Sequence, residues 1–120
     1  MFEYGAELVN VVDGDTFDFL IDMGFNIQHK IRVRLFGVDT PEIYHPRNRA
    51  ELAHGLEAKE FVERHFLGKK GIVNTVKDRK GKYGRYLANF TICTSENEIL
   101  NLAISLVEAG LEKKDVYEES

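Results

Sequence analysis

The sequence predicts a mainly β fold of the α+β class, built as one small closed barrel of five strands with two flanking helices. The chain has 120 residues, the length of one ordinary domain. Five segments alternate apolar and polar residues as strands do, and two others repeat apolar residues at helical spacing. Because five short strands leave exposed edges unless their sheet closes, we expect a closed antiparallel barrel.

The first two predicted strands form a hairpin. Residues 8–12 alternate as a strand does, and residues 16–22 form a second strand with its large apolar groups on one face. Asp13 and Gly14 stand between them, and Asp-Gly is a residue pair that favours tight turns. The two strands are therefore expected to pair directly.

The third predicted strand carries the first strongly cationic face. It covers residues 30–35, after a turn around residues 23–28. Its apolar residues alternate with Lys and Arg, so the two kinds of side chain point to opposite faces of the sheet. Arg34 is therefore expected to point away from the apolar core.

The remaining predicted elements are two helices and two strands. Residues 56–67 place apolar groups at helical spacing and end before a glycine, which predicts the first helix. Residues 71–77 and 86–92 predict two strands joined by a basic loop that contains glycine. A second helix is predicted within residues 99–110.

Helices after the third and fifth strands are the arrangement of an OB-fold Greek-key barrel. Residues 1–111 are expected to form this domain, and residues 112–120 an acidic C-terminal tail. Barrels of this type often bind oligonucleotides, but a fold alone supports only an analogy.

The composition is that of a folded, soluble protein, with 43% hydrophobic and 30% charged residues. The apolar runs are far shorter than the ~20 residues of a membrane-spanning helix, and the N-terminus lacks a secretory signal. We expect a monomer without a membrane partner, cytoplasmic as the chain is written. A secreted or a phage- or host-associated location is the alternative for a trimmed fragment.

The net charge of −4 is unevenly distributed. Residues 29–85 contain 14 Lys and Arg against 7 Asp and Glu, whereas the rest of the chain contains 2 against 13. The densest basic runs, residues 29–34, 45–49 and 77–85, can contact phosphates. Any single run is also explained as ordinary solvated surface. The acidic total therefore does not exclude a nucleic acid as partner.

Two short segments bring carboxylates and an arginine together. Asp13 and Asp15 occupy the first turn, where an ordinary Asp-Gly turn is the alternative explanation. Arg34, Asp39 and Glu42 follow within nine residues of one another, with a proline that restricts the backbone between the two carboxylates. The second segment is much more specific than the first.

A third segment, residues 82–88, adds Arg85 and flanking aromatic residues. Together with Arg34, Arg85 and the four carboxylates of the first two segments are the kinds of group that can form a reaction centre. Cys93 has no adjacent base in sequence, and the four histidines lack the spacing of zinc ligands. Nothing in the sequence indicates a covalent nucleophile.

In these segments the chain resembles the staphylococcal nuclease-like (thermonuclease) family. The resemblance spans roughly residues 6–111. It implies an OB-fold enzyme: a calcium-dependent, sugar-nonspecific nuclease that hydrolyses phosphodiester bonds of DNA and RNA and leaves 3′-phosphate ends. The matching motifs, in chain order, are Val12-Asp13-Gly14-Asp15-Thr16, Arg34-Leu35-Phe36-Gly37-Val38-Asp39-Thr40-Pro41-Glu42 and Lys82-Tyr83-Gly84-Arg85-Tyr86-Leu87-Ala88.

The resemblance also implies how the site holds its metal and water. Asp15, Asp39 and the backbone carbonyl of Thr40 are expected to bind one Ca²⁺, with water completing the coordination. Asp13 supports these ligands without binding the metal itself. Glu42 orients or deprotonates the attacking water, and the sequence leaves both roles open. Oxygen ligands of this kind suit a hard cation.

The resemblance assigns the phosphate contacts to Arg34 and Arg85, whose guanidinium groups match phosphate oxygens in geometry. Lys82, Tyr83 and Tyr117 are the expected nucleic-acid contacts, with DNA and RNA, single-stranded or frayed, as partners. The chain departs from the family in two places. The turn at residues 23–28 is longer, and the family's third helix has no counterpart in this sequence.

A noncatalytic nucleic-acid-binding or protein-binding module of the same fold is the alternative function. Such modules usually lose some of the catalytic carboxylates or arginines. Every matched position is retained here, which favours the enzyme.

Overall fold

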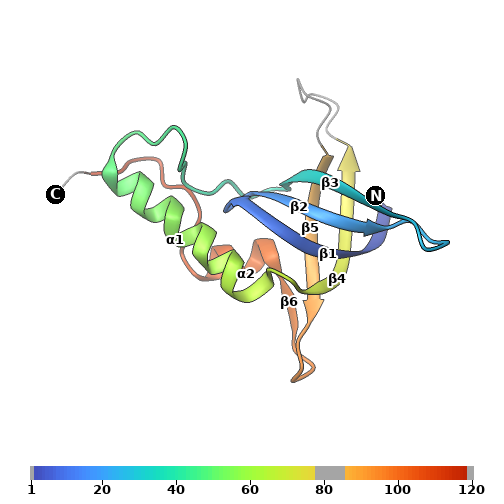
Figure 1. Cartoon of the computed structure of the whole chain (residues 1–120). Helices are drawn as coiled ribbons and strands as arrows, with labels where there is room; N and C mark the ends of the chain where they lie inside the picture. Colours follow the sequence, from blue (N-terminus) through green and yellow to red (C-terminus); the bar gives the residue numbers. More distant parts are fainter. Residues whose placement is uncertain (1, 78–85, 119–120) are drawn as a thin grey trace.

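Five strands form a closed barrel in the computed structural model, which describes residues 2–77 and 86–118 (Figure 1). The sheet order is β3-β2-β1-β4-β5, and a pairing between β3 and β5 closes it. All other neighbours in the barrel are antiparallel, but this closing pair is parallel, which corrects the expectation of a wholly antiparallel barrel. The strands are β1 (Phe2–Asp13), β2 (Thr16–Asp22), β3 (Gln28–Leu35), β4 (Lys70–Lys77) and β5 (Tyr86–Cys93).

Strand β1 is longer than predicted and belongs to both halves of the barrel. Its first residues pair with β4, from Phe2 opposite Thr75 to Glu7 opposite Lys70. Its later residues pair with β2, and the register shifts after Leu8. Such a shift bends a strand, which lets one strand serve two walls of a small barrel.

The first helix, α1 (Arg49–Phe66), begins seven residues before the predicted start at residue 56. The side chain of Asn48 caps it by accepting the Glu51 backbone N–H at 3.0 Å. The outward-facing residues of the first turn are polar, so the spacing of apolar residues did not reveal where the helix begins. The C-terminal half of α1 lies against the barrel (Figure 1).

The second predicted helix is divided into two elements. Residues Ile99–Asn101 form β6, which pairs with β5, and α2 (Leu102–Glu108) follows directly. Asn101 ends the strand and caps the helix, because its side chain accepts the Ile104 N–H. The prediction of a helix from residue 99 was therefore wrong for the first three residues, which form a short strand.

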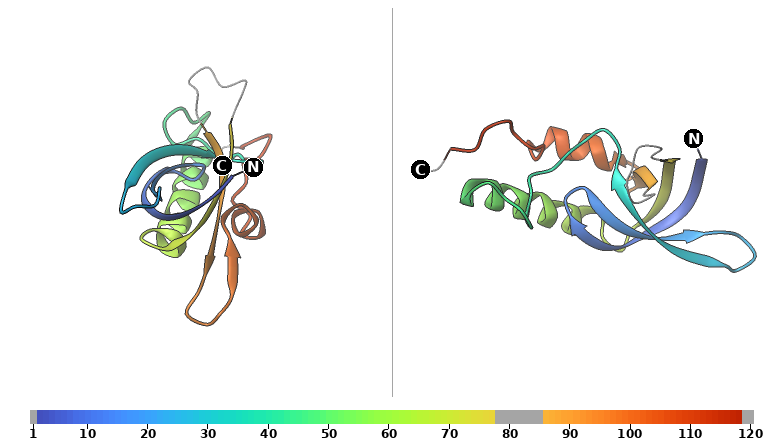
Figure 2. Two further views of the ribbon diagram at one scale, coloured as in Figure 1. Left: turned by 90° about the vertical axis from the view of Figure 1, so that its right-hand side faces the viewer. Right: turned by 90° about the horizontal axis from the view of Figure 1, so that it is seen from above.

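The core fills the inside of the barrel and continues to α1 and α2. The rings of Phe19 and Phe90 contact each other within it at a tilted angle, with centroids 4.9 Å apart, and the ring of Phe66 from α1 lies 6.4 Å from that of Phe90. All three side chains are buried, together with Val62 of α1. The predicted OB-type barrel with two helices is thus confirmed, and α1 closes one of its mouths (Figure 2).

Two segments lie outside the barrel, the β2–β3 turn and the C-terminal segment. The long β2–β3 turn projects from the barrel, with Phe25 97% exposed at a φ of 54° (Figure 1). The C-terminal segment, residues 111–118, returns along α1 (Figures 1 and 2). Within the described residues, neither helix is long and apolar enough to cross a membrane.

Candidate active site

The turn between β1 and β2 holds Asp15 at the start of the candidate site. Thr16 pairs with Arg34 across β2 and β3, so Asp15 and Arg34 lie at the same end of these strands. The Leu35 N–H donates to the Asp15 carbonyl oxygen at 2.8 Å, and the Asp15 N–H donates to Asp13 Oδ1 at 3.0 Å. Asp13 therefore fixes the backbone of Asp15, and its role as a support for the metal ligands stays a prediction.

Arg34 lies between two carboxylates. Its Nη2 atom lies 2.6 Å from Asp39 Oδ1 and 3.9 Å from Asp15 Oδ2. Partial burial lowers the pKa of Arg34, but the charges of Asp15 and Asp39 outweigh this effect and raise the pKa. The structure thus brings together three residues that lie up to 24 positions apart in the sequence.

Asp15 is buried, with only 7% of its surface exposed. Burial, followed by the hydrogen bond and charge of Asp13, raises its pKa to about 6. The Thr40 N–H, which donates to Asp15 Oδ2 at 3.0 Å, and the charge of Arg34 act in the opposite direction. A cation at this carboxylate would offset the cost of burying its charge.

Thr40, in the loop after β3, packs against the β1–β2 turn that holds Asp15. Its side chain is buried, and its Oγ1 has no hydrogen-bond partner among the residues that the structure describes. Gly14 leaves room for it, because a Cβ at position 14 would lie 2.7 Å from Thr40 Oγ1 and 2.9 Å from the Cβ of Ala58. The β1–β2 turn, the Thr40 loop and α1 therefore pack in direct contact.

Glu42 lies on the same loop, next to α1. A Cβ added to Gly55 of α1 would lie 2.7 Å from the Pro41 carbonyl oxygen and 3.1 Å from that of Glu42. The glycine thus allows the loop to approach the helix backbone closely. The Glu42 N–H donates to Glu51 Oε2 at 3.0 Å. This bond fixes the position of the Glu42 backbone relative to α1.

Glu51 is a buried residue of the site that sequence reasoning missed. Its carboxylate also accepts the backbone N–H and the Nε–H of Arg47, at 3.0 and 2.9 Å. Burial tends to raise its pKa, but the bonds from Glu42 and Arg47 and the charge of Lys113 prevail and lower the pKa to about 2. The sequence Asn48-Arg49-Ala50-Glu51 has the spacing of a capping box, a signal that could have marked this helix start.

Three predicted site residues, Lys82, Tyr83 and Arg85, lie outside the described residues. The strand that follows them is placed, because Leu87 of β5 pairs with Arg34 of β3. Their assigned contacts with phosphate and nucleic acid stay predictions.

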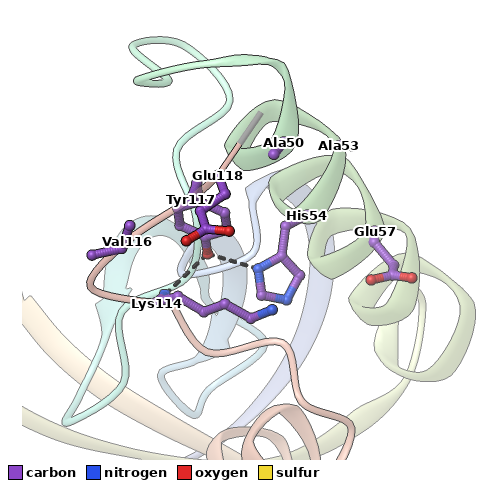
Figure 3. A pocket seen from close by; sticks show the side chains of 8 residues that line it. All are labelled: Ala50, Ala53, His54, Glu57, Lys114, Val116, Tyr117 and Glu118. Carbon is purple, nitrogen blue, oxygen red and sulfur yellow. Dashed lines mark hydrogen bonds between the residues drawn. The ribbon is translucent and has the colours of Figure 1, made fainter. Parts of the chain in front are cut away.

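Tyr117, predicted to contact nucleic acid, lies against α1 (Figure 3). Its hydroxyl oxygen is 2.7 Å from His54 Nδ1 and accepts the Lys114 N–H at 3.0 Å. The guanidinium of Arg47 lies 5.2 Å from the centre of its ring. Beside these groups is a cavity of about 560 Å³. It is lined by Ala50, Ala53, His54, Glu57, Lys114, Val116, Tyr117 and Glu118.

The residues present fit a calcium ion by their chemistry. No group of three or more His, Cys, Asp or Glu side chains within the described ranges is arranged to hold a metal. The set implied by the family resemblance would need only two, because the Thr40 carbonyl and water would supply the remaining ligands beside Asp15 and Asp39. Arg34 brings both carboxylates to one place, and all of these donors are oxygens, which Ca²⁺ prefers.

The closed barrel, with two carboxylates and an arginine grouped where β2 begins and β3 ends, makes this chain an OB-type barrel protein with a charged site at one end of these strands. The model of the family described as Staphylococcal nuclease homologue matches residues 32–120. The chain therefore belongs to this family.

Three curated proteins are similar to the chain. The thermonuclease of Staphylococcus hyicus is 35% identical over 86 residues, which are 72% of this chain and 47% of that protein. The thermonuclease of Staphylococcus intermedius is 33% identical over 107 residues, 89% of this chain and 57% of that protein. An uncharacterized protein of Methanocaldococcus jannaschii is 31% identical over 124 residues, with the same two coverages. The chain spans about half the length of these relatives.

Proposed function

We propose that this chain is a calcium-dependent nuclease that hydrolyses phosphodiester bonds of DNA and RNA and leaves 3′-phosphate ends. The observation that carries the proposal is the contact of one Arg34 nitrogen with both Asp39 and Asp15, beside the loop of Glu42. Two of the relatives are thermonucleases, which supports the same activity.

In this proposal Asp15, Asp39 and the Thr40 carbonyl hold Ca²⁺, which supplies positive charge next to the reacting phosphate. Asp13 keeps Asp15 in place through its bond to the Asp15 N–H. Glu42, fixed through its own backbone N–H, orients the attacking water and accepts its proton. The water oxygen forms a bond to phosphorus, the bond from phosphorus to the 5′ oxygen breaks, and this oxygen takes a proton from the solvent to become a 5′-hydroxyl.

Arg34 and Arg85 offset the negative charge that builds on the phosphate oxygens in this step. Lys82, Tyr83 and Tyr117 are the proposed nucleic-acid contacts. Contacts to phosphate carry no information on the sugar, so both DNA and RNA are expected substrates. The side chain of Arg34 is only 39% exposed, and a flexible single-stranded or frayed end reaches it more readily than a rigid duplex does.

The test is to incubate the purified protein with single-stranded DNA and RNA in Ca²⁺ or in EDTA. The wild type should cut both in Ca²⁺ only, and Glu42→Gln and Arg85→Ala should bind the strand but cut it far more slowly. Arg64→Ala, at an exposed arginine of α1, is the matched control for Arg85→Ala and should behave as the wild type. Binding without cutting would identify a noncatalytic module, and cutting in EDTA would contradict the calcium assignment.

A further inference from the structure

The loop that carries Glu42 is hydrogen-bonded to one buried carboxylate, that of Glu51. Glu51 Oε2 accepts the Glu42 N–H, and Glu51 Oε1 accepts the backbone N–H and the Nε–H of Arg47. Residues 42 and 47 are the two ends of an irregular segment that lies between β3 and α1. One side chain of the helix thus ties both ends of this segment to the helix that follows it.

The position of Glu51 is costly for a charged group. Its side chain has 0% exposure, and removing a carboxylate from water costs several kcal/mol unless hydrogen bonds replace the water. An apolar residue could fill such a site, but it could accept no hydrogen bond. The bonds that compensate the charge of Glu51 all come from the loop and the C-terminal segment, so its energetic role is to hold those two segments.

The C-terminal segment takes part in the same arrangement. Lys113 Nζ lies 3.6 Å from Glu51 Oε2, and the Lys113 N–H donates to the Asp39 carbonyl oxygen at 2.8 Å. The segment is held in turn by Arg47, which donates to the carbonyl oxygens of Lys114 and Asp115 at 2.9 and 2.6 Å. Lys113 therefore contacts the candidate site, and Lys114 and Asp115 contact Arg47 beside it.

A second set of contacts holds Tyr117, near the end of this segment (Figure 3). His54 lies between the Tyr117 hydroxyl and the Gly110 carbonyl oxygen, at 2.7 and 2.8 Å. The carbonyl only accepts, so Nε2 of His54 donates to it. Asn48 at the start of α1 donates to the Tyr117 carbonyl oxygen at 2.6 Å. Both ends of the segment are thus bonded to α1 or to the residues just before it.

We propose that Glu51 is a positioning residue for Glu42, held in place from the C-terminal side by Lys113. The inference rests on the proposed function, because it concerns how that site holds its water-binding carboxylate. Glu51 does not touch the substrate. It sets where the backbone of Glu42 lies, and a displacement of a reacting group by about 1 Å costs up to roughly a hundredfold in rate.

The test compares Glu51→Gln with Glu60→Gln, a change on the exposed side of the same helix. Glutamine keeps the size and one acceptor oxygen, but its amide nitrogen would face a donor. We expect kcat on a single-stranded DNA oligonucleotide to fall by roughly ten- to a hundredfold, with KM within about twofold. The amide hydrogen of Glu42 should exchange with solvent faster, while that of Val62 in the same helix is unchanged. Glu60→Gln should alter neither measurement.

Lys113→Met is the second variant, for the case that Glu51→Gln does not fold. It removes one contact of Glu51 and should give the same pattern, lower kcat and faster Glu42 exchange, to a smaller extent. Unchanged kcat and unchanged Glu42 exchange in a folded variant would overturn the proposal. If the wild type does not cleave at all, the proposed function fails, and the exchange of the Glu42 amide alone decides whether Glu51 holds that residue.

Discussion

Arg34 donates from Nη2 to Asp39 Oδ1 over 2.6 Å, and the same nitrogen is 3.9 Å from Asp15 Oδ2. The guanidinium therefore supports the two proposed metal ligands and is also the proposed phosphate contact. Its replacement should affect both functions, because one group serves them together.

Arg34→Lys should lower kcat on DNA by roughly 10²- to 10³-fold, the usual loss for one preorganised donor at a reacting oxyanion. Lysine keeps the charge but lacks the planar fork that matches two phosphate oxygens. Steady-state cleavage of a labelled oligonucleotide measures the effect, with Arg64→Lys as control. A variant within threefold of the wild type would show that the fork geometry is not needed.

Asp15→Asn should weaken Ca²⁺ binding by roughly tenfold or more, because the ion loses a charged oxygen ligand. Calorimetric titration of the protein with Ca²⁺ measures this without any substrate. Asp22→Asn is the matched control, since Asp22 is exposed and, among the residues that the structure describes, its side chain accepts only the Gly24 N–H in the β2–β3 turn. Equal affinity of wild type and Asp15→Asn would remove Asp15 from the metal site.

The grouping of Asp15 and Arg34 could be predicted because a local rule places both residues. Each lies at the end of a strand with clear alternation, and the tight turn after β1 sets the register that pairs Thr16 with Arg34. The hairpin, the third strand and the closed barrel were predicted correctly for the same reason. The parallel pairing of β3 with β5 has no local signal, since it joins residues more than 50 positions apart.

The part of the site built by Glu51 and Lys113 could not be predicted in this way. A glutamate near a helix start is usually exposed, and its burial here depends on donors from residues 42, 47 and 113. The prediction of an acidic C-terminal tail at residues 112–120 rested on charge and on the end of the family resemblance at residue 111. Charge does not reveal that backbone groups of the segment bond to Arg47 and Asp39.

Gly14→Ala should destabilise the protein by about 1–3 kcal/mol, the usual cost of overpacking a core. The added Cβ would lie 2.8 Å from Thr40 Cγ2 and 2.9 Å from Ala58 Cβ, so Thr40 must move. Gly5→Ala is the control, because its Cβ would meet only Asp22 Cβ, at 3.9 Å. Urea unfolding measures both, and equal stability of the two variants would contradict the close packing at Thr40.

Glu51 should make the protein lose stability in acid. Its pKa of about 2 in the folded state lies below the ordinary value of 4.5. The ionised carboxylate therefore stabilises the fold fully above about pH 4.5, and this contribution disappears as the pH falls towards about 2. The difference in unfolding free energy between wild type and Glu51→Gln should shrink over this interval in urea titrations. A difference that stays constant with pH would show that the charge of Glu51 is not what matters.

Hydrolysis of single-stranded DNA in ¹⁸O-labelled water tests the central claim most directly. If water held by Glu42 attacks phosphorus and the bond to the 5′ oxygen breaks, each cut should leave a 3′-phosphate carrying one ¹⁸O and an unlabelled 5′-hydroxyl. Mass spectrometry of the fragments reads both ends. Unlabelled 3′-phosphates, 3′-hydroxyl ends, or intact DNA in the presence of Ca²⁺ would contradict the account.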